Sequence, residues 1–305
     1  MDHRRPEALA RIASAFDLPG PPGPIEPLGR GLINDTFKLA AGGRGFVLQR
    51  INPSVFPNPE QIMTNLLRLS EQARGAGAVG LRIPGVVRAR DGRPYSRGTD
   101  GALWRLMELV EDGVNLPRIE SLEQAAEVGR TLGRFHRLAA RLPEGALAVS
   151  LPGFHHTPDY LERHLGAREG WAQGPESEGA EGRAVRTCFE QIDRRRGLAS
   201  VLHTALAEGR IGERVIHGDP KLDNVLFHRV SGQALALIDL DTVQPGLIQH
   251  DLGDCLRSCC NRSGEAPASE AGAEFDLGLA AAILAAYGEE TRGMLGAGDI
   301  AVLYD

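Results

Sequence analysis

Apolar positions near the N-terminus change from helical spacing to the alternation that is typical of strands. Residues 5–17 carry apolar side chains at three- and four-residue steps, with Pro6 near the start, which favours a short helix. Residues 25–39 and 46–51 alternate or cluster like strands, and Gly42–Gly43 supplies a turn between them. The pattern therefore predicts one helix followed by an antiparallel sheet.

Helical spacing returns at residues 59–74, where Pro59 suits the first turn and the apolar side chains form one stripe. Residues 82–90 and 103–109 then have the character of strands and are expected to complete the sheet. The first third of the chain is therefore predicted to combine this sheet with one long helix.

After residue 112 the pattern becomes mainly helical. Ser121 followed by Gln124 is typical of a capped helix start, and apolar residues follow at helical steps. Two further segments are predicted as helices: residues 184–207 and 271–287. Residues 169–184 are rich in Gly, Glu and Ala and are predicted as the least ordered loop.

A hairpin interrupts the helical second half. Residues 225–228 and 234–238 are predicted as strands, and residues 231–233 as the turn between them. Asn224 precedes the first strand and Asp239 follows the second. Because a hairpin returns the chain to its starting end, the Asn224 and Asp239 side chains are expected to lie close together.

Composition is that of an ordinary globular enzyme. The 305 residues allow a large core, and 42% apolar with 24% charged residues exclude a disordered chain. The net charge is -6 without a long basic stretch, so no nucleic-acid partner is expected. No signal peptide and no run of about eighteen apolar residues occurs, so we expect a cytoplasmic protein without a membrane partner.

Four cysteines occur in the chain: Cys188, Cys255, Cys259 and Cys260. Cys255 and Cys259 are four residues apart, which places them on one face of a helix. Because a zinc site needs more ligands at closer pairings, buried reduced thiols are expected.

Residues 215–227, Val-Ile-His-Gly-Asp-Pro-Lys-Leu-Asp-Asn-Val-Leu-Phe, have the layout of a phosphoryl-transfer site. Asp219 lies five residues before Asn224, and Asp239 lies fifteen residues further on. One carboxylate can accept the proton of an attacking hydroxyl, while an amide and a second carboxylate hold Mg²⁺ against the phosphates of ATP. We therefore expect Asp219 to be the base and Asn224 and Asp239 to be the metal ligands.

Two neighbours of Asp219 have separate predicted roles. Lys221 is one of only two lysines, and its compact charge could neutralise the transferring phosphoryl group. The alternative is a solvent-facing loop lysine. His217 is expected to shape the loop through hydrogen bonds, because the sequence suggests no hydroxyl or thiol nucleophile beside it.

The His-Gly-Asp of residues 217–219, Asn224 and the Ile-Asp of residues 238–239 resemble the catalytic loop and metal segment of the aminoglycoside phosphotransferase and choline kinase superfamily. This resemblance implies an α+β, bilobal protein-kinase-like fold. It also implies three regions: an N-lobe over residues 1–108, a hinge over 109–111, and a mostly helical C-lobe over 112–305.

Several segments are similar to the N-acetylhexosamine 1-kinase branch of that superfamily: residues 31–37, 46–52, 55–57, 154–158 and 238–242. The similarity implies transfer to the anomeric hydroxyl of N-acetylglucosamine or N-acetylgalactosamine. Asp241, Phe154 and His155 are then expected to contact this substrate, although the Phe154 segment could equally be a loop packed on the C-lobe. The alternatives are a kinase of choline, homoserine or an aminoglycoside, and a nucleotide-binding pseudokinase.

The resemblance also implies where the nucleotide binds. A glycine hairpin would cover the phosphates with backbone N–H groups, and the hinge would pair with adenine. The residues expected in this site are Gly29, Gly31, Asn34, Gln49, Glu108 and Val110. Asp251 is expected to support the catalytic loop by accepting hydrogen bonds from its backbone.

The chain departs from the family pattern in two places. Protein kinases carry a phosphate-binding lysine on the third strand, whereas Gln49 is nearest that position here and Arg50 should face the opposite side. Relatives in the N-acetylhexosamine branch continue beyond the point that matches Asp305. An incomplete C-lobe is therefore expected, without a family arginine near the sugar.

Overall fold

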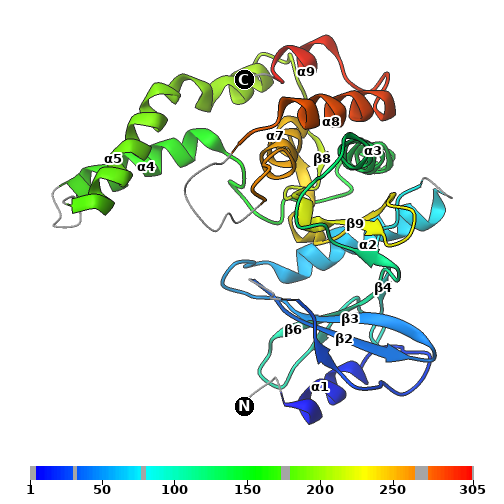
Figure 1. Cartoon of the computed structure of the whole chain (residues 1–305). Coiled ribbons are helices and arrows are strands. Elements are labelled where there is room, and N and C mark those ends of the chain that lie inside the picture. Colours follow the sequence, from blue (N-terminus) through cyan, green and yellow to red (C-terminus); the bar gives the residue numbers. More distant parts are fainter. Residues whose placement is uncertain (1–4, 30–32, 77–79, 173–178, 265–273, 304–305) are drawn as a thin grey trace. The chain divides into compact units, whose positions relative to one another are not determined.

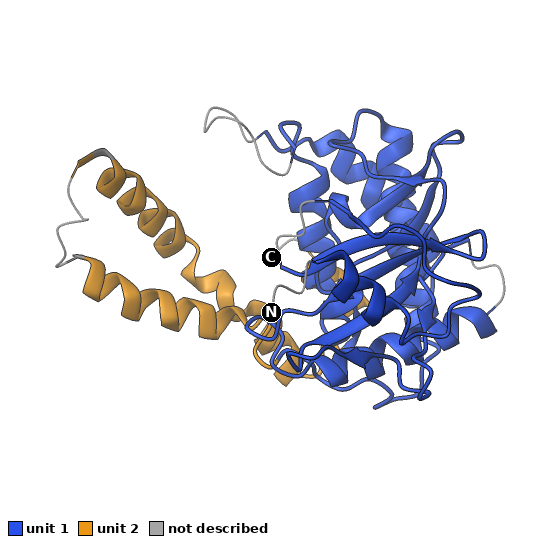
Figure 2. Ribbon diagram, turned by 90° about the horizontal axis from the view of Figure 1, so that it is seen from below, with its two compact units in different colours: residues 1–151, 214–294 blue, residues 152–213, 295–305 orange. Residues whose placement is uncertain are grey.

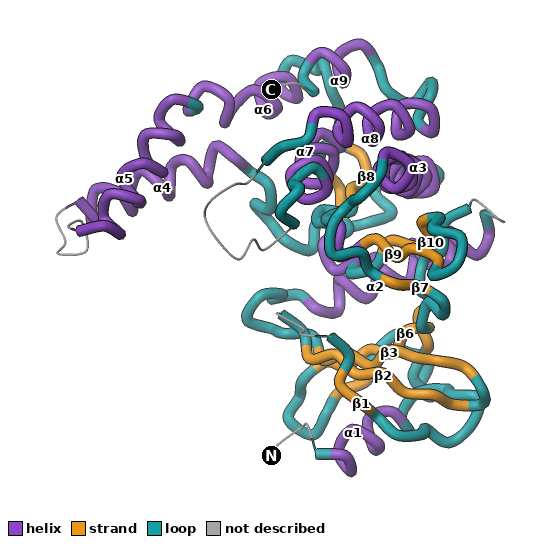
Figure 3. Tube along the Cα trace, viewed as in Figure 1, coloured by secondary structure: helices purple, strands orange, loops and turns teal. Residues whose placement is uncertain are grey.

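The structure is a computed structural model that describes residues 5–29, 33–76, 80–172, 179–264 and 274–303. Two compact units can be distinguished in the chain (Figure 2): the first is Met1–Leu151 with Arg214–Met294, and the second is Pro152–Glu213 with Leu295–Asp305. The first unit combines antiparallel sheets with helices, and the described elements of the second unit are helical (Figures 1 and 3). This mixture confirms the predicted α+β class.

The first unit contains a six-stranded sheet with the order β1-β2-β3-β6-β4, in which β5 also pairs with β6. Its strands are β1 (Glu26–Pro27), β2 (Asp35–Ala41), β3 (Arg44–Arg50), β4 (Val86–Val87), β5 (Ser96–Arg97) and β6 (Leu103–Glu108). Gly42 and Gly43 turn the chain between β2 and β3 with φ of 55° and 77°, which glycine adopts without strain. The predicted antiparallel sheet is therefore confirmed.

Helix α1 (Pro6–Ala13) packs on one face of this sheet. The core here joins buried side chains of the helix and the sheet, including Leu9, Ala13, Phe16, Phe37, Leu48 and Trp104. The helix is shorter than the predicted range of 5–17, because Phe16 has left it to form a β-bridge with Ala89.

Helix α2 (Pro59–Gly75) closely matches the predicted range of 59–74. Its apolar stripe is buried and consists of Ile62, Met63, Leu66 and Leu69. Asn65 of the same helix is 1% exposed, and its amide donates to the carbonyls of Ala148 at 2.8 Å and Val243 at 3.1 Å. These bonds connect α2 to residue 148 and to the chain that follows the hairpin predicted over residues 225–238.

Helices α3 (Leu122–Ala139) and α8 (Leu277–Glu290) lie side by side (Figure 1). Gly129 allows the close approach, because a Cβ atom at this position would lie 2.2 Å from the carbonyl oxygen of Ile283. A glycine in a helix lowers its intrinsic stability. Here that cost is offset by the packing of the two backbones.

Side-chain caps set the start of both helices. Ser121 accepts a hydrogen bond from the N–H of Gln124 at 3.2 Å, as predicted, but the Gln124 side chain accepts from the N–H of Glu120 instead of Ser121. At α8, the Asp276 carboxylate accepts from two backbone N–H groups. The helix predicted over residues 271–287 therefore begins directly after this cap.

The predicted hairpin is confirmed by β9 (Val225–His228) and β10 (Ala234–Leu237), which pair antiparallel. The short strand β7 (Gly113–Val114) pairs with β9. Strands β8 (Arg214–Ile216) and β11 (Gln244–Gly246) form a separate two-stranded sheet, and helix α7 (Ile248–Cys259) follows β11. Cys255 and Cys259 on α7 and the following Cys260 are buried free thiols, as expected, whereas Cys188 is a free thiol but is exposed, so the expectation of a buried thiol was wrong there.

The second unit consists of α4 (Thr157–Ala172), α5 (Gly179–Arg194), the 3-10 helix η2 (Arg196–Ser200), α6 (Val201–Ala207) and α9 (Ala297–Ala301). The prediction of a loop over residues 169–184 was wrong at both ends, which belong to α4 and α5. Contacts between these helices explain the difference: Arg168 pairs with Asp193 at 2.5 Å, and the rings of Trp171 and Phe189 lie 5.1 Å apart.

The single helix predicted over residues 184–207 is also corrected, because η2 separates α5 from α6. Gly197 lies in this interruption, and glycine has a low helix propensity. Among the described residues, no helix combines the length and the apolar character that a membrane crossing requires.

Candidate active site

The predicted catalytic loop, which contains residues 217–224, follows β8 and is held by a buried carboxylate on α7. Asp251 accepts hydrogen bonds from the backbone N–H groups of His217 at 2.7 Å and Gly218 at 2.8 Å. His136 of α3 contacts the same carboxylate at 2.9 Å and the hydroxyl of Tyr287 at 2.8 Å. Burial acts to raise the pKa of Asp251, but the hydrogen bond and charge of His136 outweigh it and hold this pKa below its usual value.

Gly218 brings the catalytic loop against the segment that follows β10. Its φ is +87°, and a Cβ atom would lie 2.8 Å from both the Cβ and the carbonyl oxygen of Thr242. The Thr242 hydroxyl donates to the carbonyl of His217 at 2.7 Å. Only glycine fits this position without displacing one of the two segments.

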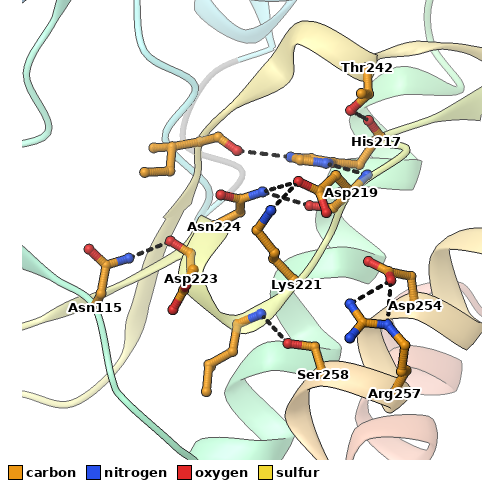
Figure 4. Close-up of polar contacts among 12 residues, drawn as sticks. Asn115, His217, Asp219, Lys221, Asp223, Asn224, Thr242, Asp254, Arg257 and Ser258 are labelled. Atoms are coloured by element: carbon orange, nitrogen blue, oxygen red, sulfur yellow. Dashed lines mark hydrogen bonds and ion pairs between the residues drawn. The ribbon is translucent and has the colours of Figure 1, made fainter. Parts of the chain in front are cut away.

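His217 joins the same two segments through its ring (Figure 4). Nε2 lies 3.1 Å from the carbonyl oxygen of Ile238, and Nδ1 accepts from the backbone N–H of Asp219 at 3.3 Å. Since a carbonyl oxygen can only accept, the ring carries its proton on Nε2 and is neutral. Burial of the ring lowers the pKa of His217.

The Asp219 carboxylate is the point at which the predicted catalytic residues meet. Lys221 Nζ donates to Asp219 Oδ2 at 2.6 Å, and Asn224 Nδ2 donates to the same oxygen at 3.1 Å and to the Asp219 carbonyl at 2.7 Å. Figure 4 shows both side chains directed at Asp219. The side chains of Asp219 and Lys221 are each 28% exposed, so the pair remains accessible to an acceptor molecule.

The backbone of the loop is fixed from both sides. The 3-10 helix η3 (Leu222–Asn224) is anchored on α7, because the N–H of Leu222 donates to the hydroxyl of Ser258 at 2.9 Å. Asn115 donates to the carbonyl of Asp223 at 2.5 Å from the other side (Figure 4). The positions of Asp219 and Asn224 therefore do not depend on their mutual contact alone.

Asp239 follows β10 in the left-handed conformation, with φ 60° and ψ 58°. The N–H of Ile238 donates to the carbonyl of Asn224 at 2.9 Å, so the two predicted metal ligands lie at the same end of the hairpin. Burial, followed by the charge of Asp241, raises the pKa of Asp239 to about 6. Burial and the neighbouring carboxylate thus disfavour the charged form of Asp239.

A bound cation would stabilise the charged form of Asp239. The amide oxygen of Asn224 and the carboxylate of Asp239 are hard donors of the kind that Mg²⁺ prefers. Among the described residues, no three His, Cys, Asp or Glu side chains are grouped to hold a metal ion by themselves. The residues present therefore fit a Mg²⁺ ion that takes its remaining ligands from phosphate oxygens and water.

Asp241 lies in the 3-10 helix η4 (Leu240–Thr242) and is 2% exposed. Its Oδ1 atom pairs with the guanidinium of Arg105, and Oδ2 accepts from Asn34 Nδ2 at 2.7 Å. Asn34, expected at the nucleotide, also accepts from the N–H of Asn52 at 3.0 Å. The carboxylate that was expected to meet the substrate is thus engaged by two protein side chains.

Arg105 was missed by the sequence analysis. Its side chain is 1% exposed, and its Nε donates to the Oε1 atom of Gln49 at 2.9 Å. The available signal was a single arginine between apolar neighbours in the strand Leu-Trp-Arg-Leu-Met-Glu of residues 103–108. A buried arginine requires partners, so this position indicated either an ion pair or an anion site.

The remaining predicted nucleotide contacts lie apart from this network. The backbone N–H of Glu108 donates to the carbonyl of Gly85 at 2.8 Å, and the Glu108 carboxylate pairs with Arg44 at 2.6 Å. Gly29 has φ +69°, and Val110 follows the end of β6. Gly31 lies outside the described residues.

The two predicted substrate residues of the second unit are neighbours. The rings of Phe154 and His155 lie 4.0 Å apart, and His155 has a φ of 61°. The N–H of His155 donates to the hydroxyl of Tyr160 at 2.9 Å. Both residues lie in the turn before α4, and their contact with a substrate stays a prediction.

Comparison with known proteins identifies related folds. The model of the phosphotransferase enzyme family matches residues 24–295. A microcompartment-associated aminopropanol kinase has 21% identity and a TM-score of 0.64, covering 97% of this chain and 84% of that chain. An aminoglycoside phosphotransferase from Alicyclobacillus acidocaldarius has 17% identity and a TM-score of 0.66, covering 96% and 80%.

A third similar structure is spectinomycin phosphotransferase in complex with ADP and spectinomycin. It has 10% identity and a TM-score of 0.59, and the match covers 98% of this chain and 83% of that chain. At these identities the three structures show a shared fold. That fold is the protein-kinase-like arrangement expected from the His-Gly-Asp and Ile-Asp segments.

Proposed function

The chain belongs to the phosphotransferase enzyme family, and from that premise we propose that it transfers the terminal phosphoryl group of ATP to a hydroxyl of a small molecule. The observation that carries this proposal is the convergence of Lys221 and Asn224 on the partly exposed carboxylate of Asp219. The spectinomycin phosphotransferase of similar fold was solved with ADP, which supports a nucleotide cofactor.

Asp219 would orient the acceptor hydroxyl and take its proton as the oxygen attacks phosphorus and the bond to ADP breaks. The amide of Asn224 holds Asp219 Oδ2 in place, which leaves the other carboxylate oxygen for the hydroxyl. Lys221 lies 2.6 Å from Oδ2 and is partly exposed, so a rotation of its flexible stem would bring the ammonium to the transferring group.

A magnesium ion, when bound, would neutralise the phosphate oxygens of the nucleotide. Asn224 and Asp239 are the residues proposed to hold it, because both lie at one end of the hairpin and carry oxygen donors. Asp251 and His217 would take no part in the chemistry. They keep the backbone of Asp219 in place.

For the acceptor we propose the anomeric hydroxyl of an N-acetylhexosamine. The supporting observation is the resemblance of five segments to the N-acetylhexosamine 1-kinase branch. One of these segments contains Phe154 and His155, whose adjacent rings offer an apolar face for a sugar and an imidazole for its hydroxyls. A neutral sugar suits such groups, whereas a cationic acceptor needs an anionic pocket.

The test is magnesium-dependent release of ADP from ATP with a panel of acceptors: N-acetylglucosamine, N-acetylgalactosamine, glucose, choline, homoserine, aminopropanol and kanamycin. We expect turnover with the N-acetyl sugars and none with their 1-O-methyl derivatives. Turnover with a cationic acceptor alone would support the proposed kinase activity but contradict the proposed sugar acceptor. Nucleotide binding without turnover across the whole panel would favour the pseudokinase alternative.

A further inference from the structure

The nucleotide-covering sheet lacks the lysine that protein kinases carry on the third strand. Gln49 occupies the nearest position on β3, and the two lysines of the chain are elsewhere, with Lys38 exposed on β2. Phosphate binding in such a site depends on a cation, because the nucleotide brings several negative charges. If the sheet is to contribute a phosphate-binding cation in addition to Lys221 and Mg²⁺, one of its other side chains must supply it.

Three strands place polar side chains opposite one another on the sheet. Thr36 of β2 pairs in register with Gln49 of β3, and Gln49 pairs in register with Arg105 of β6. Gln49 Nε2 donates to the Thr36 hydroxyl at 3.0 Å, and Arg105 Nε donates to Gln49 Oε1 at 2.9 Å. The sheet neighbours Phe37 and Leu48 belong to the α1 core, so this polar row lies on the opposite face.

The guanidinium of Arg105 is held by two fixed acceptors. Nε is bonded to Gln49, and Nη1 pairs with the Asp241 carboxylate, whose other oxygen accepts from Asn34. Because a guanidinium is planar, these two bonds also set the direction of Nη2. The guanidinium of Arg105 is therefore held in one orientation by these two bonds.

One donor of this buried cation has no acceptor. Among the residues that the structure describes, Arg105 Nη2 is buried and has no hydrogen-bond partner. A buried N–H donor without an acceptor is unfavourable, and an anionic oxygen is the partner that suits an arginine best. The partner of Arg105, Asp241, lies two residues after the proposed metal ligand Asp239, so the open donor lies beside the segment that is proposed to hold the metal and the phosphates.

We infer that Arg105 supplies from β6 the phosphate-binding cation that β3 lacks, donating from Nη2 to a phosphate oxygen of the nucleotide. This inference rests on the proposed kinase function. Gln49 and Asp241 act as positioning residues, since they hold the Nε and Nη1 edges of the guanidinium. Asn34 in turn holds the second oxygen of Asp241, which explains why the carboxylate does not need the substrate as a partner.

The experiment compares ADP with adenosine, because adenosine lacks the phosphates. Dissociation constants of both are measured by calorimetry for the full chain with Mg²⁺. The variant combines Arg105→Met with Asp241→Asn, so that no uncompensated charge is left buried. We expect the affinity for ADP to fall about ten- to hundredfold, the range of a hydrogen bond to a charged group, and that for adenosine to stay within about twofold.

Two further variants test whether the loss of affinity for ADP is caused by the loss of the Arg105 charge. Arg50→Met removes an arginine from β3 that pairs with Asp100 at 3.4 Å, and it should leave both affinities unchanged. Adding Gln49→Lys to the double variant returns a cation to the third strand, and it should restore part of the affinity for ADP.

Equal losses for ADP and adenosine would give Arg105 a purely structural role and overturn the inference. An unchanged affinity for ADP in the double variant, or no gain from Gln49→Lys, would overturn it as well. If the wild-type chain binds neither ligand, the proposed function itself fails together with the inference. The wild-type measurement therefore separates the two failures.

Discussion

The carboxylate of Asp251 accepts a hydrogen bond of 2.7 Å from the backbone N–H of His217, which lies 34 residues earlier in the chain. Its second oxygen accepts from the N–H of Gly218 at 2.8 Å. The shape of the catalytic loop therefore depends on a group that lies outside it and is fully buried on α7.

Replacing Asp251 with Asn should damage both stability and turnover. One of its acceptor oxygens becomes an NH₂ group, which leaves a buried backbone N–H without a partner and costs about 1–3 kcal/mol. Urea unfolding followed by tryptophan fluorescence measures the loss, and kcat should fall because Asp219 is displaced. Asp254→Asn on the same helix is the control. Asp254 pairs with the exposed Arg257, so its loss should stay below about 1 kcal/mol. Equal losses in the two variants would contradict this assignment.

Asp219→Asn should lower kcat by about 10²-fold or more, the scale expected when a positioned base is removed. Asparagine keeps the size of the side chain and its contact with Asn224, so thermal stability should change little. Steady-state rates with the best acceptor give the result. Asp223→Asn serves as the control, since its side chain is exposed in the same loop. A full rate in Asp219→Asn would remove Asp219 from the mechanism.

The buried ring of His217 predicts a pH dependence of stability. Its pKa in the folded chain is lowered, whereas the unfolded chain takes up a proton near the ordinary value of about 6.5. Between the lowered pKa of the folded chain and about pH 6.5, the unfolded state therefore binds more protons than the folded state. The contribution of the neutral His217 ring to stability is complete above about pH 6.5 and decreases as the pH drops toward the folded pKa.

Urea unfolding between about pH 5 and 7 tests this dependence, with His217→Gln as the comparison. The slope of the unfolding free energy should decrease in the variant by at most about 1.4 kcal/mol per pH unit, which corresponds to one proton. Identical slopes in the two proteins would show that His217 does not contribute.

Gly129→Ala should destabilise the first unit. The added Cβ would lie 2.2 Å from the carbonyl oxygen of Ile283, so α3 and α8 must separate, at a cost of about 1–3 kcal/mol. Gly253→Ala on α7 is the matched control, because no atom lies within 4 Å of its added Cβ. That variant should gain about 0.5–1 kcal/mol from helix propensity. Melting temperatures that shift alike would refute the packing role of Gly129.

The elements predicted correctly from the sequence have local signals. The turn at Gly42–Gly43, the cap at Ser121 and the hairpin that follows Asn224 all depend on residues close to one another in the chain. The spacing of Asp219, Asn224 and Asp239 predicted that these residues lie close together for the same reason. A hairpin converts a short separation in sequence into proximity.

Contacts between residues that lie far apart in the sequence could not be predicted from such local signals. Arg105 meets Asp241 across 136 residues, and its bond to Gln49 depends on the pairing of β6 with β3, neither of which a local pattern indicates. The pairing of α4 with α5 was missed for a related reason. Gly and Glu in that stretch favoured a loop, while Trp171 and Phe189 gain their contact only when both helices form.

The glycine between His217 and Asp219 bears on how such an enzyme could be regulated. Protein kinases have arginine at this place in the His-Arg-Asp motif, and arginine side chains that bind a phosphorylated activation loop are one way of switching a kinase on. Here Thr242 lies where the first atom of any side chain would have to be. An arginine at residue 218 would have to displace Thr242, so this loop does not present the side chain on which that switch depends.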